Sequence, residues 1–247
     1  MVGGLAVPPV GGKLQPRNRL LAVLPDDALL TVRPHLQTVS FTQGHVLVDA
    51  NAPMTRIYFV ESSVVALLTV FDNDAAVGVA TVGREGVVGV ATLLLGGEAA
   101  LGRYQILVPG SALAMDVSPF RRALRESGQL RAVCEAYTRA LFAQVLQAVP
   151  CAKLHTVEQR CARWLLMCAD QTDEGTVEIA QESLARILAV PPSTMSAVAS
   201  SLQRAGVIRH RRGMIVANDR QGLEATACEC YRIIRDRYER LLPPTSA

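Results

Sequence analysis

The chain has 247 residues, of which 50% are hydrophobic, 4% aromatic and 19% charged, and its formal net charge is +3. This length suits one large domain or two of ordinary size, and so apolar a chain of low net charge cannot be disordered throughout. The longest uncharged apolar runs, 86–97 and 140–152, are shorter than the roughly 18–20 residues that span a bilayer. The first 16 residues lack the apolar core of a signal peptide, so we expect a cytoplasmic protein with no membrane partner.

The first half of the chain is expected to hold a loose terminus followed by a β-rich domain. Residues 1–17 are rich in glycine and proline, which predicts a flexible N-terminus. After a short helical stretch, runs of β-branched and aromatic residues recur between turn residues at roughly 8–12 residue spacing, which predicts an antiparallel barrel or roll. We therefore assign 18–127 to a β-roll domain, in which Arg84 and Glu85 are expected to lie in an exposed turn.

A long helix is predicted over 128–153, and Pro150 is expected to interrupt or kink it near its end. Its apolar residues recur every three or four positions, like one seam of a coiled coil. Such a seam could pack on its own β-roll, but no second long helix is evident to cover both flanks, and this favours a homodimer interface. The predicted interface residues are Leu130, Val133, Tyr137, Leu141, Val145 and Ala148.

All six cysteines lie in the second half of the chain, at positions 134, 151, 161, 168, 228 and 230, in stretches that indicate helix. The paired short spacings and turn residues of a structural zinc site are missing. Cys228 and Cys230, two residues apart, would point to different faces of a helix. Buried free thiols are therefore favoured over a metal or redox site, and no metal ligands are predicted.

Residues 181–204 have the pattern of a helix, a tight turn and a second helix. The inward positions of both helices are apolar, and the small Ala185 stands where the two helices must approach closely. Pro191 belongs to the turn, and Pro192 suits the first position of the second helix. The outer face of the second helix then presents small polar side chains. This spacing predicts a helix-turn-helix.

Two short β runs follow, 206–210 and 214–216, and they are joined across Arg211, Arg212 and Gly213. A hairpin with arginines at its tip, directly after a helix-turn-helix, indicates a winged helix. Residues 181–220 contain six arginines against Glu182 and Asp219, a local net charge of +4 that favours phosphate contacts over a merely solvated face. The candidate DNA-binding residues are Gln181, Ser193, Thr194, Ser196, Ser200, Arg204, Arg209, Arg211 and Arg212.

Over about residues 18–241 the chain resembles the cyclic-AMP receptor protein/FNR (Crp/Fnr) family of bacterial transcription regulators. The resemblance rests on "IAQESLARILAVPPSTMSAVASSLQRAGVIRHRRGMIVANDRQGLE", on "TVEQRCARWLLM" before it, and on "VGREGVVG" in the β-roll. It implies an α+β fold with an N-terminal antiparallel β-roll like a cyclic-nucleotide-binding jelly roll, a dimerisation helix over 128–153 and a winged helix-turn-helix domain over 154–247. It further implies a homodimer on a palindromic operator in double-stranded DNA, an effector of unknown identity, and RNA polymerase as a further partner.

The chain departs from the family on the recognition helix. The resemblance places an arginine, a glutamate and an arginine where this chain has Pro192, Ser193 and Ala197. Arginine and glutamate are side chains that read guanine and cytosine in the major groove. We therefore expect modest sequence specificity and a strong dependence of binding on salt.

A second departure lies in the effector pocket. The family's Gly-Glu and Arg-Ser pairs for cyclic nucleotides correspond to Gly89-Val90 and Gly102-Arg103. Val90 offers no acceptor to a ribose hydroxyl and Arg103 is displaced by one residue, so cyclic AMP is disfavoured as the ligand. An iron–sulfur cluster is also disfavoured, because no cysteine precedes Cys134. Haem ligation by His35 or His45 stays open beside the interpretation of both as ordinary surface or core residues.

An enzyme is not indicated, because the four histidines are dispersed and the common catalytic motifs are missing. The serious alternative to a DNA-binding regulator is a cyclic-nucleotide-type sensor module that acts through a protein partner, with weak or no specific DNA binding. This alternative predicts that no duplex is bound at any salt concentration.

Overall fold

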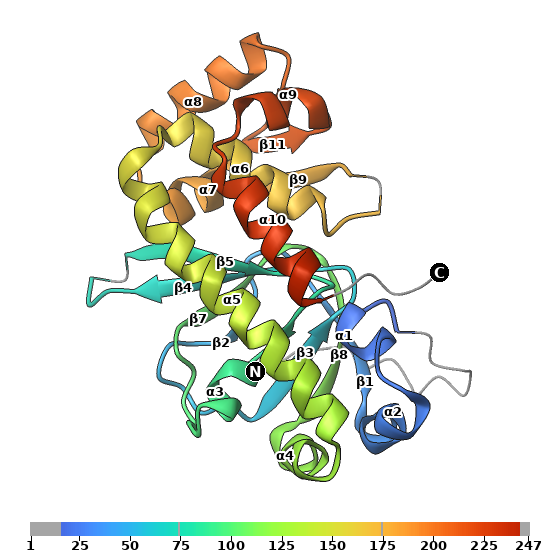
Figure 1. Ribbon diagram of the computed structural model, residues 1–247. Helices are drawn as coiled ribbons and strands as arrows, with labels where there is room; N and C mark the ends of the chain where they lie inside the picture. Colours follow the sequence, from blue (N-terminus) through green and yellow to red (C-terminus); the bar gives the residue numbers. More distant parts are fainter. Residues whose placement is uncertain (1–15, 74, 174, 243–247) are drawn as a thin grey trace.

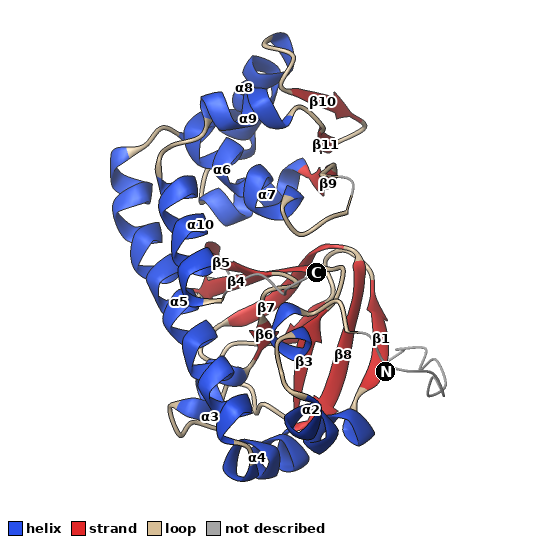
Figure 2. Ribbon diagram, turned by 45° about the vertical axis from the view of Figure 1, so that its right-hand side comes forward, coloured by secondary structure: helices blue, strands red, loops and turns tan. Residues whose placement is uncertain are grey.

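The computed structural model of the protein describes residues 16–73, 75–173 and 175–242. Most of the predicted flexible terminus, residues 1–15, lies outside the described residues. A β-rich half and a mostly helical half lie one above the other along a long helix, α5 (Gly128–Leu154) (Figures 1 and 2). Among the described residues, no helix combines the length and apolar character needed to cross a membrane.

The β-rich half is an antiparallel roll of two four-stranded sheets. The strand orders are β1-β8-β3-β6 and β2-β7-β4-β5, and the apolar side chains between the sheets form its core. The strands are β1 (Gln37–Phe41), β2 (Val46–Val48), β3 (Arg56–Val60), β4 (Val64–Val70), β5 (Ala76–Val82), β6 (Val87–Val88), β7 (Arg103–Val108) and β8 (Gly110–Asp116). The flanking helices are α1 (Arg19–Ala22), α2 (Asp26–Val32), the 3-10 turn η1 (Arg33–His35), α3 (Val90–Leu94) and α4 (Val117–Glu126).

Helix α3 was not expected from the sequence, because the glycines around it interrupt the pattern of apolar residues in this segment. Gly89 precedes the helix with a φ of 92°, in the left-handed region that glycine adopts readily. A side chain at this position would also displace the terminal methyl group of Met54. The glycine therefore permits the turn from β6 into α3 rather than preventing a helix.

Helix α5 has a second helix beside it, α10 (Cys230–Leu241), which runs along one flank (Figures 1 and 2). The rings of Tyr137 in α5 and Tyr238 in α10 lie 6.4 Å apart in an edge-on arrangement. The buried Gln144 carboxamide lies 2.9 Å from the Tyr238 hydroxyl and 3.1 Å from the Thr81 hydroxyl of β5. Helix α5 thus packs on both the roll and α10, and it continues through Pro150 to its end.

This packing corrects the predicted dimer seam. Leu130, Tyr137 and Leu141 are at most 5% exposed because they face the core of their own chain, so they are not available to a partner. Val133 and Val145 are half-buried against the same core, and Ala148 is also half-buried. The sequence analysis did not anticipate α10 as the cover for this flank. The large apolar side chains that α5 exposes are instead Phe142, Leu146, Val149 and Leu154.

The helical half begins at Thr156, whose side chain and that of Gln159 form a capping box at the start of α6 (Val157–Ala169). It continues as β9 (Val177–Ala180), α7 (Gln181–Leu188), α8 (Pro192–Arg204), β10 (Ile208–Arg211), β11 (Met214–Ala217) and α9 (Arg220–Thr226). The strands form an antiparallel sheet in the order β10-β11-β9. Trp164 of α6 is 1% exposed and belongs to the core of this half.

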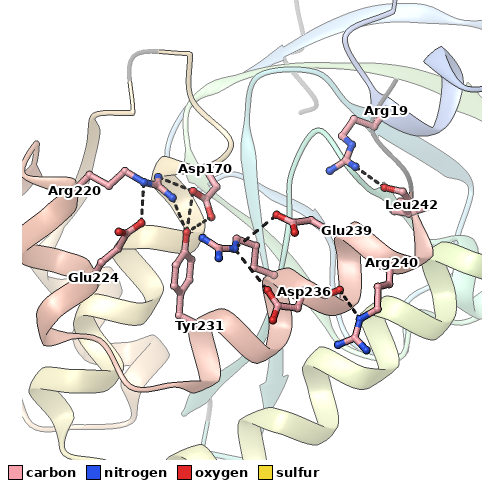
Figure 3. A network of polar contacts seen from close by, with 10 residues as sticks. Arg19, Asp170, Arg220, Glu224, Tyr231, Asp236, Glu239, Arg240 and Leu242 are labelled. Atoms are coloured by element: carbon pink, nitrogen blue, oxygen red, sulfur yellow. Dashed lines mark hydrogen bonds and ion pairs between the residues drawn. The ribbon is translucent and has the colours of Figure 1, made fainter. Parts of the chain in front are cut away.

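The two halves are in direct contact. Gly78 of β5 lies so close to α7 and α6 that an added Cβ would be 2.6 Å from Ile187 and 2.8 Å from Trp164. The backbone N–H of Arg84 donates to the Gln171 side chain at 3.0 Å. Figure 3 shows a polar network within the helical half, where Arg220 contacts Asp170 and Tyr231, and a contact between the halves, in which the Arg19 guanidinium of α1 donates to the Leu242 carbonyl at 2.5 Å. A displacement of either half would therefore act on the other through these contacts.

Candidate nucleic-acid interface

The helix-turn-helix consists of α7 and α8. Helix α7 ends at Leu188, and its C-cap Ala189 has a φ of 53°, in the left-handed region, which turns the chain sharply. Helix α8 then begins with Pro192 as its first residue. Met195, Ala199 and Leu202 of α8 are at most 1% exposed and pack inward. This packing leaves the opposite face of α8 to solvent.

The exposed face of α8 carries the predicted polar residues. Ser193, Ser196, Ser200 and Arg204 are exposed, and Thr194 is half-buried. The half-buried Gln181 of α7 donates to Ser196 at 3.0 Å, and the Ser196 hydroxyl donates to the Pro192 carbonyl at 2.9 Å. These bonds connect α7 to the start of α8 across the face that would meet DNA.

The wing is a tight hairpin of β10 and β11. Arg212 and Gly213 have φ values of 49° and 78°, and Arg211 pairs directly with Met214 across the turn. Two adjacent left-handed residues are typical of the type I′ hairpin turn. The Gln203 carboxamide of α8 accepts from the backbone N–H of His210 at 3.0 Å, and this bond ties the wing to the second helix. The sequence analysis missed Gln203, because only the fold brings it to β10.

The six arginines behind the local charge of +4 fall into two groups, those that form ion pairs and those that do not. Arg186 forms an ion pair with Glu182 at 3.3 Å, and Arg220 forms one with Asp170 at 2.7 Å (Figure 3). Among the described residues, no ion pair involves the remaining arginines of this region. These are the exposed Arg204, Arg209, Arg211 and Arg212. The unpaired positive charge thus lies at the end of α8 and on the wing.

The four candidate effector-pocket residues are engaged in other contacts. The Val90 side chain is fully buried in the core. An added Cβ on Gly102 would lie 2.6 Å from the Leu68 carbonyl oxygen. The Arg103 guanidinium donates to both carboxylate oxygens of Asp49, at 2.8 and 3.1 Å, and this contact lowers the pKa of Asp49. Gly89, Val90, Gly102 and Arg103 line neither of the two described cavities.

The larger of these cavities, of about 190 Å³, lies where the roll meets α5, α6 and α10. Arg84 and Glu85 both line it, and Glu85 is only 7% exposed. The expectation of an exposed turn is therefore wrong for Glu85, because the α6 and α10 side chains that cover the turn come from the distant half of the chain. Burial raises the pKa of the Glu85 carboxyl above its ordinary value.

Both histidines considered as haem ligands lie at the surface. His35 is exposed, and His45 is exposed with its ring stacked on Phe41 at 5.7 Å. Neither histidine lines either of the two described cavities.

The six cysteines are all buried and free of disulfides, but they fall into two groups. Burial in apolar surroundings raises the pKa of Cys134 and Cys161 to about 12 and that of Cys168 further still, so these three are unreactive core residues. Cys151, Cys228 and Cys230 form a separate buried cluster. The argument from helix faces fails here, because Cys228 precedes α10 and only Cys230 belongs to it.

Comparisons with known proteins agree with this geometry. Residues 159–226 match the Crp-like helix-turn-helix domain family. A transcriptional regulator of the Crp/Fnr family from Eubacterium rectale superposes with a TM-score of 0.62 at 16% identity, over 82% of this chain and 94% of that chain. The c-di-GMP-responsive regulator CLP of Xanthomonas campestris superposes with a TM-score of 0.63 at 13% identity, over 78% of this chain and 99% of that chain. FixK2 from Bradyrhizobium japonicum superposes with a TM-score of 0.62 at 16% identity, over 78% of this chain and 98% of that chain. A search of the curated proteins found no match.

Proposed function

We propose that the chain is a non-enzymatic DNA-binding transcription regulator of the Crp/Fnr type, which acts as a cytoplasmic homodimer on a palindromic operator under a signal received by its β-roll half. This proposal is supported by the match of residues 159–226 to the Crp-like helix-turn-helix domain family and by the fold that the chain shares with Crp/Fnr regulators. The effector is unidentified, and RNA polymerase is the further partner that this type of regulator would contact.

The proposed mode of DNA binding rests on where the arginines that form no ion pair lie. Arg209, Arg211 and Arg212 are exposed on the wing, and Arg204 ends the exposed face of α8. Arginines of this kind bind phosphates strongly and without regard to sequence. The face of α8 itself offers serine and threonine hydroxyls, which provide few of the bidentate contacts that distinguish bases. We therefore expect strong salt dependence with modest sequence specificity.

The homodimer proposal rests on the exposed side of α5. Phe142, Leu146 and Val149 are 61%, 53% and 72% exposed and follow one another at spacings of four and three. This is the repeat that two helices use when they pack along a shared seam. A second copy of this chain is the occupant that we propose for this stripe, because a two-fold dimer would also present two α8 helices to one face of DNA.

The signal reaches the winged helix, in this proposal, through the contacts between the two halves. Gly78 of the roll lies against Ile187 and Trp164, and the Arg19 guanidinium donates to the Leu242 carbonyl between the same two halves (Figure 3). A ligand that moves β5 would shift α7 through this contact. Cyclic AMP is disfavoured as that ligand, because Val90 is buried and Arg103 is paired with Asp49.

In vitro selection from random duplexes tests the proposal. The full chain should enrich an inverted repeat whose half-sites are about one helical turn, roughly 34–36 Å, apart. Information content at each half-site should be low, because α8 lacks charged base-reading side chains. Enrichment of a single unrepeated site would contradict the dimer, and the absence of any enrichment or duplex binding would favour the protein-partner alternative.

A further inference from the structure

We propose that Cys151, His155, Cys228 and Cys230 form a site for one zinc ion. Their ligand atoms, three Sγ and one imidazole nitrogen, all lie within 4.8 Å of one another. Three thiolates and one imidazole are a donor set typical of structural zinc. The proposal departs from the expectation drawn from the sequence that the chain has no metal ligands, and it does not depend on how the protein binds DNA.

The distances fit a tetrahedral ion. Ligand atoms about 2.3 Å from zinc in a tetrahedron are about 3.8 Å from each other. The Sγ atoms of Cys151 and Cys228 are 3.6 Å apart, and the Sγ of Cys230 lies 3.7 Å from Nδ1 of His155. The site therefore needs little rearrangement to accept one ion.

The chain positions these ligands with two short local spacings. Cys151 lies in the last turn of α5 and His155 is its C-cap, four residues on, so both project from the same side of that helix end. Cys228 lies in the segment between α9 and α10, and Cys230 is the first residue of α10. A bound ion would thus join the end of α5 to the start of α10.

The surroundings orient the ligands as a metal site requires. Nε2 of His155 lies 3.1 Å from a carboxylate oxygen of Glu229. If Nε2 carries the proton and donates it to Glu229, the lone pair of Nδ1 points toward the three sulfur atoms, which is the usual carboxylate–histidine–metal arrangement. The Gln147 amide donates to the Sγ of Cys230 at 3.1 Å, a bond that supports a thiolate.

Two arginines balance the charge that the loaded site would carry. Zinc with three thiolates and a neutral imidazole has a net charge of −1. Arg163 is 4% exposed, and no ion pair involves it among the described residues. Its guanidinium and that of the half-buried Arg160 both act electrostatically on Cys151. A buried cation needs such a counter-charge.

The site would be structural, because four protein ligands leave no position open for a substrate. Cys151, Cys228 and Cys230 are at most 3% exposed, while the His155 side chain is 13% exposed and provides the rim through which an ion can enter. Loading would release up to about three thiol protons to solvent per ion. It would brace the junction between the long helix and the winged-helix domain.

Metal analysis of the purified full chain tests the proposal. We expect about one zinc per chain, and after removal of zinc by a chelator we expect titration with Co²⁺ to give the thiolate charge-transfer and intense visible bands of tetrahedral cobalt. Cys228→Ala should abolish these bands, whereas Cys134→Ala, which removes an equally buried thiol outside the cluster, should retain them. Glu229→Gln should keep one ion with affinity weakened by about 10–100-fold.

His155→Gln serves as a second ligand variant in case Cys228→Ala fails to fold, because it keeps all three thiols and changes only the rim of the site. It should weaken cobalt binding by more than Glu229→Gln does. The proposal is overturned if the wild-type chain binds neither zinc nor cobalt, if the ligand variants bind them as tightly as wild type, or if Cys151 and Cys228 are found as a disulfide in protein prepared with zinc under reducing conditions.

Discussion

The exposed stripe on α5 gives a sharp test in the variant Leu146→Asp. Leu146 is 53% exposed in the single chain, so the substitution should leave the folded monomer intact. In the proposed dimer the same side chain is covered by a second copy. The variant should therefore separate assembly from folding, which Leu141→Asp cannot do, because Leu141 is 5% exposed and belongs to the core.

The size of the effect follows from this exposure. Full burial of a leucine contributes about 1.5–3 kcal/mol, so covering the exposed half contributes about 1 kcal/mol per copy, or about 2 kcal/mol per dimer. An unpaired carboxylate in the apolar seam adds at least about 1–3 kcal/mol per copy. The sum of about 4–8 kcal/mol corresponds to a dimer dissociation constant weakened by about a thousandfold or more.

Sedimentation velocity over a range of concentrations measures this constant directly. The matched control is Leu101→Asp, which places the same charge at a 65% exposed leucine of the roll and should leave the dimer unchanged. At a dilution where both chains are monomeric, the thermal midpoint of Leu146→Asp should stay close to that of Leu101→Asp, whereas at higher concentration the dimeric Leu101→Asp chain should melt at the higher temperature. A Leu146→Asp protein that dimerises as tightly as wild type would refute the assignment of the seam to this face.

Two further predictions concern the junction between the halves. Gly78→Val should lower the free energy of unfolding in urea by about 1–3 kcal/mol, because its Cβ would press on Ile187 and Trp164. Gly128→Ala is the control and should not destabilise the chain, because nothing lies within 4 Å of a Cβ added there. Equal stability of the two variants would contradict the contact between the halves. Glu85 keeps its proton to higher pH in the folded than in the unfolded chain, so wild-type stability should fall as pH rises from 4.5 through the raised pKa, and Glu85→Gln should remove this part of the pH dependence of the melting temperature. An identical pH dependence of the two proteins would show that Glu85 ionises normally.

The sequence was informative wherever the determining contacts are local. Pro191 and Pro192 mark the turn, the apolar spacing defines the inner faces of α7 and α8, and Gly213 permits the wing turn, so the winged helix could be predicted from one continuous segment. The family model over residues 159–226 and the fold comparisons confirm this domain and the α+β class.

Prediction failed where distant segments meet. Helix α5 has apolar residues on two faces, and the sequence could not tell the face that packs on the roll and α10, with Tyr137, from the face exposed to a partner, with Phe142. The cysteine cluster is a similar case, because Cys151 and Cys228 are 77 residues apart and only the packing of α10 on α5 brings them together. Glu85 is buried for the same reason, beneath residues of α6 and α10.

The central claim, that this winged helix binds DNA through its wing arginines, is tested most directly by a salt titration of duplex binding. Fluorescence anisotropy would compare wild type with the triple variant Arg209→Ala, Arg211→Ala, Arg212→Ala. The control is the triple variant Arg122→Ala, Arg125→Ala, Arg237→Ala, which removes the same charge from exposed positions outside the wing.

The wing variant should bind every duplex more weakly, and its plot of log affinity against log salt should be flatter by up to about one unit per lost phosphate contact. The control should keep the wild-type slope. A wing variant with wild-type affinity and slope, or a wild-type protein that binds no duplex at any salt concentration, would contradict the claim.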